Sequence, residues 1–312
     1  MSHAVPAMST VEIQFDPASL VLINLLLAVM MFGVSLELRV AHFSAILRAP
    51  KAPVVGLIAQ FLLLPALTCA LIWLLPIAPE LGLGMLLLAA CPGGTFSNIM
   101  TWLARGDVAV SVSMTAVSSL AASVLTPLNF AFYAWLNPKT QALLSSIHIA
   151  PLELLLMVLL VLGVPLVAGM WVGRRFPQLS QRIEQPLRWV ALAVMLGFVA
   201  IAFGRNWSAF VAHFHLFFYL VVGHNALALL VGFAAARLTG LNPAQQRAIT
   251  LEVGIQNAAL GLAIIFTFFP QATGMLLIAA FWGTWHLVSG LLLALYWSRQ
   301  PLPVLSEAKP CA

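Results

Sequence analysis

Long apolar stretches alternate along the chain with short breaks that contain charged residues, proline or glycine. A helix needs about 20 apolar residues to cross the hydrocarbon core of a membrane. The pattern therefore predicts an all-α polytopic membrane protein with nine transmembrane helices, which make residues 1–312 a single transmembrane domain. The apolar runs that predict these helices lie near residues 17–37, 52–75, 79–104, 108–135, 150–174, 187–204, 209–239, 243–269 and 273–298.

Composition agrees with the pattern. The chain is 62% hydrophobic and 7% charged, with a mean hydropathy of +1.04, whereas soluble domains carry about 25% charged residues. Residues 1–16 contain no basic segment of the kind that begins a signal peptide, so we expect the first run to be retained as a helix. The three cysteines show neither metal-ligand spacing nor a disulfide framework.

Basic residues are distributed unequally between the two sides of the predicted bundle. Twelve of the 14 Lys and Arg residues fall in the C-terminal tail or in the connections after runs 1, 3, 5 and 7, and the remaining two are Lys139 and Arg205. Because basic residues near helix ends are retained in the cytoplasm, we expect the N-terminus outside and the C-terminus inside, in the inner (plasma) membrane. The net charge of +5 then reflects topology and attraction to anionic lipid, and no nucleic-acid partner is expected.

One carboxylate lies at membrane depth. Of the nine acidic residues, Glu252 is the one well inside an apolar run, and the others lie in tails, loops or at run ends. An ionised carboxylate at the bilayer centre costs about 3 kcal/mol or more. A proton, a basic side chain or a metal cation must therefore offset its charge, and every Lys and Arg lies in a tail, in a loop or at a helix end.

Two apolar runs are interrupted by helix-breaking and polar residues. Residues 91–101 read CPGGTFSNIMT in the third run, and residues 252–257 read EVGIQN in the eighth. Broken helices are tolerated at membrane depth where the freed backbone lines a cavity or is buried in protein, and hard cations prefer oxygen ligands. Paired interruptions in the two halves of a chain are typical of inverted-repeat secondary transporters with a binding site near the midplane.

Other apolar runs also contain polar residues. Ser111 and Thr115 are four residues apart and share one helix face, although such residues serve close packing more often than ion binding. Gln60 in the second run mirrors His224 and Asn225 in the seventh if the two halves repeat. By itself, Gln60 fits interhelical hydrogen bonding and ion ligation equally well.

These motifs, taken in order, closely resemble those of the bile acid:sodium symporter family. The resemblance is carried by the segments LIAQFLLLPA (57–66), CPGGTFSNIMTWLARGDVAVSVSMT (91–115), HN (224–225), EVGIQN (252–257) and WH (285–286). It implies a panel domain, about residues 17–37, 150–174 and 187–204, packed on a core domain, about residues 52–135 and 209–298. In that core, two broken helices cross and two sodium ions bind near the crossing.

The resemblance also implies site residues. It implies that the first sodium ion is held by Ser97, Asn98, Ser111, Thr115 and Glu252. It implies that the second is held by Gln60, Glu252, Gln256 and the backbone carbonyls of Val253 and Ile255. It places Thr95, Asn257 and His286 at the substrate cavity. No cofactor is expected besides the two coupling ions.

This sequence departs from the pattern of many bacterial relatives at the expected cavity wall. Where those relatives read QNSG, this chain has Ala258 and Ala259, and Leu287 replaces an Asn after the Trp–His pair. These changes remove polar groups near the substrate and leave the implied sodium ligands intact. Several bacterial relatives carry an additional N-terminal helix, so the nine runs counted here resemble the animal members.

We therefore expect sodium-coupled uptake of an organic anion, either bile-acid-like or a small carboxylate, by alternating access. A proton-coupled or exchange carrier of the same fold, in which Glu252 titrates, is an alternative. A membrane enzyme with Glu252 and His286 as acid and base is a weaker one, because neither a nucleophile nor a metal cluster accompanies them. Neither the identity of the anion nor the oligomeric state follows from the sequence.

Overall fold

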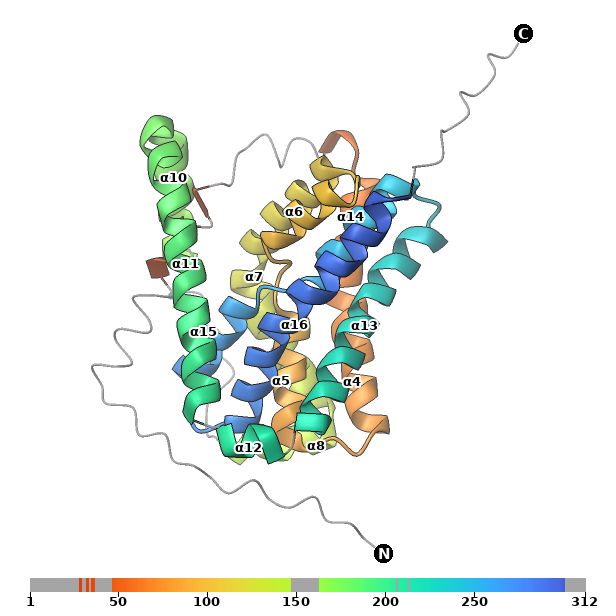
Figure 1. The fold of residues 1–312 in the computed structure, drawn as a ribbon, viewed down its shortest axis with the longest axis vertical. Helices are drawn as coiled ribbons and strands as arrows, with labels where there is room; N and C mark the ends of the chain where they lie inside the picture. The colour runs from red at the N-terminus through yellow and green to blue at the C-terminus, as the bar shows by residue number, and fades with distance from the viewer. Residues whose placement is uncertain are drawn as a thin grey trace, which may run out of the picture.

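The computed structural model describes residues 28, 29, 32, 33, 35, 36, 47–146, 163–205, 207–212 and 214–300. These residues form helices joined by short turns (Figure 1). Most of the first predicted helix, and the part of the fifth before residue 163, lie outside the described residues. Four described helices are long and apolar enough to cross a membrane, namely Lys51–Leu74, Val108–Leu136, Phe217–Leu238 and Thr273–Ser298.

The helix of the second run widens by one π-helical turn around Gln60. It consists of α3 (Lys51–Ile58), the π-helical η1 (Ala59–Leu63) and α4 (Leu64–Leu74). Pro65 at the start of α4 has no N–H to donate to the carbonyl of Phe61, and that carbonyl accepts a 2.7 Å hydrogen bond from Asn129 Nδ2 instead. Widened turns of this kind are frequent at functional sites.

The two interruptions predicted from the sequence are confirmed as helix breaks. Helix α5 (Pro79–Ala90) is separated from α6 (Phe96–Leu103) by residues 91–95, and α14 (Pro243–Gly254) is separated from α15 (Ala258–Phe268) by residues 255–257. The backbone is extended at Cys91 and at Ile255. The third and eighth runs are therefore each two half-helices.

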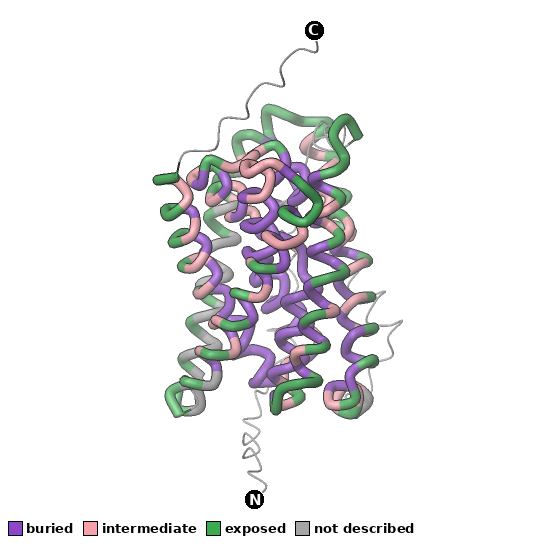
Figure 2. Tube along the Cα trace, turned by 90° about the vertical axis from the view of Figure 1, so that its right-hand side faces the viewer, coloured by how far each residue is buried: buried purple, intermediate pink, exposed green. Residues whose placement is uncertain are grey.

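Three long helices surround these half-helices: α7 (Val108–Leu136), α13 (Phe214–Leu238) and α16 (Thr273–Ser298). Buried residues are concentrated along the middle of the bundle (Figure 2), where α5, α15 and α16 pack together. The short helices α8 (Pro138–Ser146) and α12 (Trp207–Ala212) lie at the end of the bundle opposite the start of α14 (Figure 1).

Helices α10 (Val164–Arg175) and α11 (Pro177–Arg205) stand side by side at one edge of the molecule (Figure 1), and α11 packs against α15 and α16. The prediction that the sixth helix begins near residue 187 is wrong, because α11 begins at Pro177. Proline suits the first turn of a helix, and most of the polar residues that follow, including Arg182, are exposed, although Ser180 is buried. The apolar run marks the part of α11 that suits the hydrocarbon core, and the helix continues beyond it.

Charged residues from the run ends satisfy backbone groups at helix termini. Lys139 Nζ donates to the carbonyls of Ile72, Trp73 and Leu75 at 2.9, 3.0 and 2.7 Å, at the end of α4. Glu80 Oε2 accepts a 2.9 Å hydrogen bond from the Gly274 N–H in the first turn of α16. Backbone groups at helix ends lack partners within their own helix, so Lys139 and Glu80 supply the missing hydrogen bonds. Each charge is also opposite in sign to the partial charge of the helix end that it contacts.

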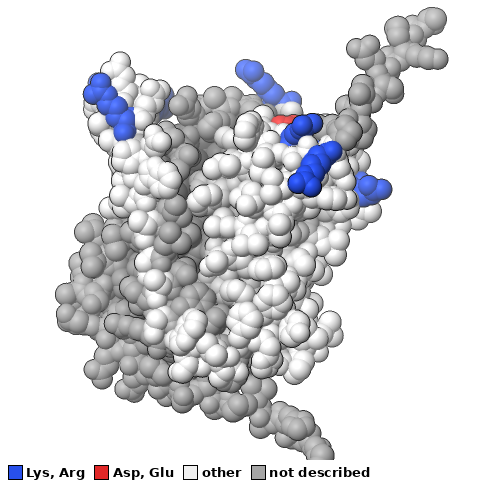
Figure 3. All heavy atoms as spheres, viewed as in Figure 1, with Lys and Arg blue, Asp and Glu red and all other residues white. Residues whose placement is uncertain are grey.

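Basic side chains gather at one end of the bundle on the face that Figure 3 shows, where α10 ends and α14 begins. The last turn of α10 carries Arg174 and Arg175, and α13 ends with Arg237 in its last turn. Lys139 lies on α8 at the opposite end. The unequal distribution of charge along the sequence thus becomes an unequal distribution between the two ends of the molecule.

Candidate functional site

The two helix breaks are joined to each other by backbone hydrogen bonds. The Gly94 N–H donates to the Ile255 carbonyl at 2.7 Å, and the Asn257 N–H donates to the Pro92 carbonyl at 2.9 Å. Gly93 and Gln256 are paired between them as an antiparallel β-bridge. This close approach favours glycine, because a Cβ atom at Gly94 would lie only 3.0 Å from the Gln256 carbonyl oxygen. Segments more than 150 residues apart thus meet in one place.

Glu252 lies beside this bridge, fully buried in the last turns of α14. Its Oε2 accepts hydrogen bonds from Ser97 Oγ and, at 3.0 Å, from Ser111 Oγ. Its Oε1 accepts one from Thr115 Oγ1 at 2.6 Å. Asn98 Oδ1 lies 2.8 Å from Ser111 Oγ and 3.2 Å from Thr115 Oγ1. The structure therefore brings together all five residues implied for the first sodium site.

This cluster holds more hydroxyl-to-acceptor contacts than hydroxyl protons. The three hydroxyls have one proton each, yet they make six contacts with the carboxylate oxygens, the Asn98 amide oxygen and the Ser111 carbonyl. Arg247, the basic side chain of the same half-helix, donates instead to the carbonyls of Ala104, Trp297 and Gln300. Some of these buried oxygens therefore face each other without a proton between them, which favours a bound cation or an added proton at this point.

The second implied group is built around the side chains of Gln60 and Gln256. Gln60 Nε2 donates to Gln256 Oε1 at 2.7 Å and to the Cys91 carbonyl at 2.8 Å, and Gln256 Nε2 donates to the Val253 carbonyl at 2.7 Å. Gln60 Oε1 is buried and has no hydrogen-bond partner among the described residues. The Ile255 carbonyl already accepts from Gly94, which leaves one of its lone pairs for another contact.

The residues implied for the substrate lie at the edges of the breaks. Thr95 and Asn257 are half-buried and precede α6 and α15, and Asn257 Oδ1 caps α15 through the Leu260 N–H at 3.0 Å. His286 is buried on α16. Gly283 and Gly290 on the same face of α16 approach Ala258 and Ile255, so His286 faces the second break.

Gln60 and Asn225 each donate a hydrogen bond to a backbone carbonyl at one of the two breaks. Gln60 binds the Cys91 carbonyl at the first break, and Asn225 Nδ2 binds the Gly254 carbonyl at the second, at 2.8 Å. Thr126 was not predicted as part of the site, yet its Oγ1 donates to the Ala90 carbonyl at 2.8 Å. The sequence around a threonine in an apolar helix does not indicate which group its hydroxyl contacts.

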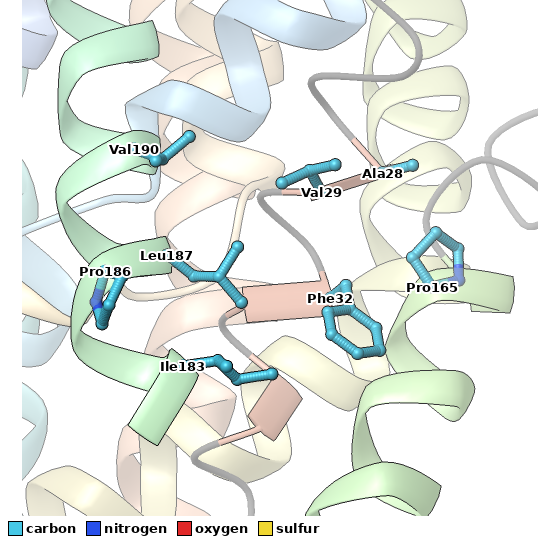
Figure 4. A pocket seen from close by; sticks show the side chains of 8 residues that line it. All are labelled: Ala28, Val29, Phe32, Pro165, Ile183, Pro186, Leu187 and Val190. Carbon is cyan, nitrogen blue, oxygen red and sulfur yellow. The ribbon is translucent and has the colours of Figure 1, made fainter. Parts of the chain in front are cut away.

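An apolar cavity of about 640 Å³ lies away from the Glu252 cluster, between residues 28, 29 and 32 and helices α10 and α11 (Figure 4). Its lining residues, among them Phe32, Pro165 and Leu187, are all apolar. The lining therefore offers no oxygen that could hold an ion.

Comparison with known proteins identifies relatives along most of the chain. The model of the Sodium Bile acid symporter family matches residues 24–213. The chain is 32% identical over 280 residues to the sodium-dependent transporter YocS of Bacillus subtilis (strain 168), and the match covers 89% of this chain and 83% of that protein.

Two further relatives come from eukaryotes. The probable sodium/metabolite cotransporter BASS1, chloroplastic, of Arabidopsis thaliana is 30% identical over 76% of this chain, and this match spans 57% of that protein. The sodium-dependent organic anion transporter of Homo sapiens is 28% identical over 90% of this chain and 73% of its own length.

Proposed function

Because this chain belongs to the sodium bile acid symporter family and is therefore a multi-pass membrane protein and a sodium-dependent solute cotransporter, not an enzyme, we propose that it takes up an organic anion together with two sodium ions by alternating access. The observation that carries the proposal is the buried carboxylate of Glu252, surrounded by hydroxyl and amide oxygens whose close contacts outnumber their protons. A desolvated carboxylate requires a partner charge, and sodium supplies it.

The two ions occupy the two groups of oxygens on either side of Glu252. The first is held by Glu252 and the hydroxyl and amide oxygens of Ser97, Asn98, Ser111 and Thr115. The second is held by Glu252, Gln60 Oε1, Gln256 and the carbonyls of Val253 and Ile255. The unpartnered Gln60 Oε1 supports this assignment, because a buried acceptor ordinarily has a partner.

Charge balance then favours an anionic substrate. Two sodium ions and one carboxylate leave a net charge of about +1 in a low-dielectric site, and an organic monoanion brings it close to neutrality. The N-termini of α6 and α15 add partial positive charge. The substrate lies near Thr95, Asn257 and His286, against a wall that Ala258 and Leu287 make less polar. The name of the human relative, an organic anion transporter, supports the same class of substrate.

The wider architecture follows the same proposal. Nine helices form two inverted repeats, in which α5–α6 and α14–α15 are the crossed, discontinuous pair of the core domain, and the first helix, α10 and α11 belong to the panel domain. The distribution of basic residues places the N-terminus outside and the C-terminus in the cytoplasm of a cell's inner (plasma) membrane. The two half-helix pairs joined at their breaks support this arrangement.

A proton-coupled or exchange carrier of the same fold is the competing function, because a proton on Glu252 would also reduce the shortage of protons in this cluster. The family membership favours sodium. Uptake measured in proteoliposomes at fixed pH, with sodium replaced by choline, separates the two. Uptake that continues in choline would contradict sodium coupling.

A thermal-shift screen tests the proposal directly. The purified chain is heated with and without sodium in the presence of candidate organic anions, with choline maintaining the ionic strength. A ligand stabilises the native state according to its concentration relative to its Kd. We expect sodium alone to raise the Tm, and a transported anion to raise it further only when sodium is present. An anion that stabilises equally in choline would contradict coupled binding.

A further inference from the structure

Helices α13 and α14 approach each other closely because glycines face the contact from both sides. A Cβ atom at Gly232 would lie 2.9 Å from the Ile249 carbonyl oxygen and 3.0 Å from Thr250 Cα. A Cβ atom at Gly254 would overlap the side chain of Leu229 on α13. This close packing brings a short side chain on α13 within hydrogen-bond distance of the backbone at the end of α14.

That side chain is Asn225, which is 1% exposed. Its Nδ2 donates to the Gly254 carbonyl at 2.8 Å, and its Oδ1 accepts from Ser289 Oγ on α16 at 2.5 Å. The amide therefore joins the end of α14 to α16, the helix that carries His286. Neither contact involves an atom assigned to sodium.

The Gly254 carbonyl is one of the last carbonyls of α14, which have no hydrogen-bond donor within their own helix. The last hydrogen bond of α14 runs from the Ile255 N–H to the Leu251 carbonyl, so Gly254 lies beyond it. This peptide immediately follows the Val253 carbonyl and lies two residues after Glu252. Because each peptide unit is planar, the direction of the Gly254 carbonyl also sets the direction in which the backbone enters Ile255.

We propose that Asn225 is a positioning residue for sodium binding. By holding the Gly254 carbonyl towards α13, it keeps Glu252 and the Val253 carbonyl in the orientation that the ions require. This inference rests on the proposed function. Without the Asn225 donor, the carbonyl would have to turn towards another partner, and the ligands beside it would turn with it.

Sodium titrations of thermal stability test this role in the full-length purified chain. The Tm is recorded against sodium concentration, with choline chloride maintaining the ionic strength, for Asn225→Leu and Asn225→Asp. Both variants remove the donor to Gly254, and aspartate retains the acceptor for Ser289. The matched control is Ser289→Ala, which loses the contact to α16 and leaves the donor to Gly254 in place.

We expect the sodium concentration for half-maximal stabilisation to rise about tenfold in both Asn225 variants, as the loss of one buried hydrogen bond implies. In Ser289→Ala it should stay within about twofold of the wild-type value. If Asn225 only stabilised the fold, its substitution would lower the Tm in choline and leave the sodium concentration for half-maximal stabilisation unchanged.

A midpoint for Asn225→Leu that is within twofold of wild type, or lower, would overturn the inference. If that variant does not fold, the midpoint of Asn225→Asp decides by the same criterion. A wild-type chain that sodium fails to stabilise would overturn the proposed function instead. The two failures are therefore distinguishable.

Discussion

Gly93 lies directly against the carboxylate of Glu252, so that a Cβ atom at Gly93 would overlap Glu252 Oε1 and come within 2.8 Å of its Cδ. One residue comes from the first helix break and the other from the half-helix that precedes the second. The absence of a side chain at Gly93 therefore leaves the space that the buried carboxylate fills at the junction between the breaks.

The substitution Gly93→Ala should displace the Glu252 carboxylate or separate the two breaks. Overpacking of this kind costs about 1–3 kcal/mol, and we expect sodium-dependent uptake to fall by about tenfold or more. The control is Gly223→Ala on α13, where a Cβ atom has nothing within 4 Å and alanine favours the helix. Equal uptake by the two variants in proteoliposomes would show that the close approach is irrelevant to transport.

Removing the charge of the shared ligand should have a larger effect than removing a ligand of one ion. Glu252→Gln should abolish sodium-dependent uptake at every accessible sodium concentration, because both ions lose their carboxylate. Gln60→Ala should weaken the apparent sodium affinity and lower the Hill coefficient of uptake. Glu80→Gln, a carboxylate change at the N-terminus of α16, serves as the control. Near-normal transport by Glu252→Gln would refute the assignment of both ions to it.

Transport of a monoanion with two sodium ions should respond to the membrane potential. Each cycle moves a net charge of +1 inward, which is worth about 2.3 kcal/mol per 100 mV. An inside-negative potassium diffusion potential of about 100 mV should therefore raise the limiting accumulation ratio by roughly 50-fold. Sodium-dependent accumulation that ignores the potential would mean that one of the two ions is not transported.

The proposed orientation can be checked by labelling cysteines in intact cells. Ala142→Cys on α8 and Arg182→Cys on α11 both occupy exposed positions, whereas the native Cys69 and Cys91 are buried. In a Cys311→Ala background, a membrane-impermeant maleimide should label residue 142 and spare residue 182 until the cells are permeabilised. The opposite pattern would reverse the topology.

Substitutions at the C-terminal ends of α6 and α13 should change the stability of the protein in opposite directions. Both helices end with paired backbone hydrogen bonds around a residue of positive φ, which is Arg105 at 55° after α6 and Gly240 at 69° after α13. Glycine adopts this conformation without strain, whereas other residues do not. Arg105→Gly should raise the free energy of unfolding by about 1 kcal/mol and Gly240→Ala should lower it by a similar amount. Chemical denaturation in mild detergent measures both changes, and changes of the same sign would contradict this explanation.

Much of the fold was predictable because a membrane helix appears in the sequence as a long apolar run. The eighth run, near 243–269, coincides with the bounds of α14 and α15 taken together, and the ninth, 273–298, with those of α16. The start of α11 was missed for the same reason, since its first turns are mostly polar and exposed. At the widened turn beside Gln60, Asn129 supplies the hydrogen bond that Pro65 cannot donate to the Phe61 carbonyl, and the hydropathy pattern does not contain this contact between distant segments.

The site was predictable in part. Glu252 stood out by its charge at depth, and the resemblance to a known family grouped it with the hydroxyls that the structure places around it. Thr126 remained hidden because its partner is a backbone carbonyl, and such carbonyls are the same for every residue type. Contacts to backbone depend on the distance between helices, and this distance is a property of the packed structure.

The backbone bridge between the two breaks also has a mechanical consequence. Gly94, Ile255, Pro92 and Asn257 tie four half-helices into one junction through two hydrogen bonds that no side-chain movement can release. In the proposed transport cycle, opening the Glu252 cluster to either side of the membrane would then come from movement of the surrounding helices relative to this junction. The junction itself would stay intact, and the barrier to transport would lie in the sliding of the helices that enclose it.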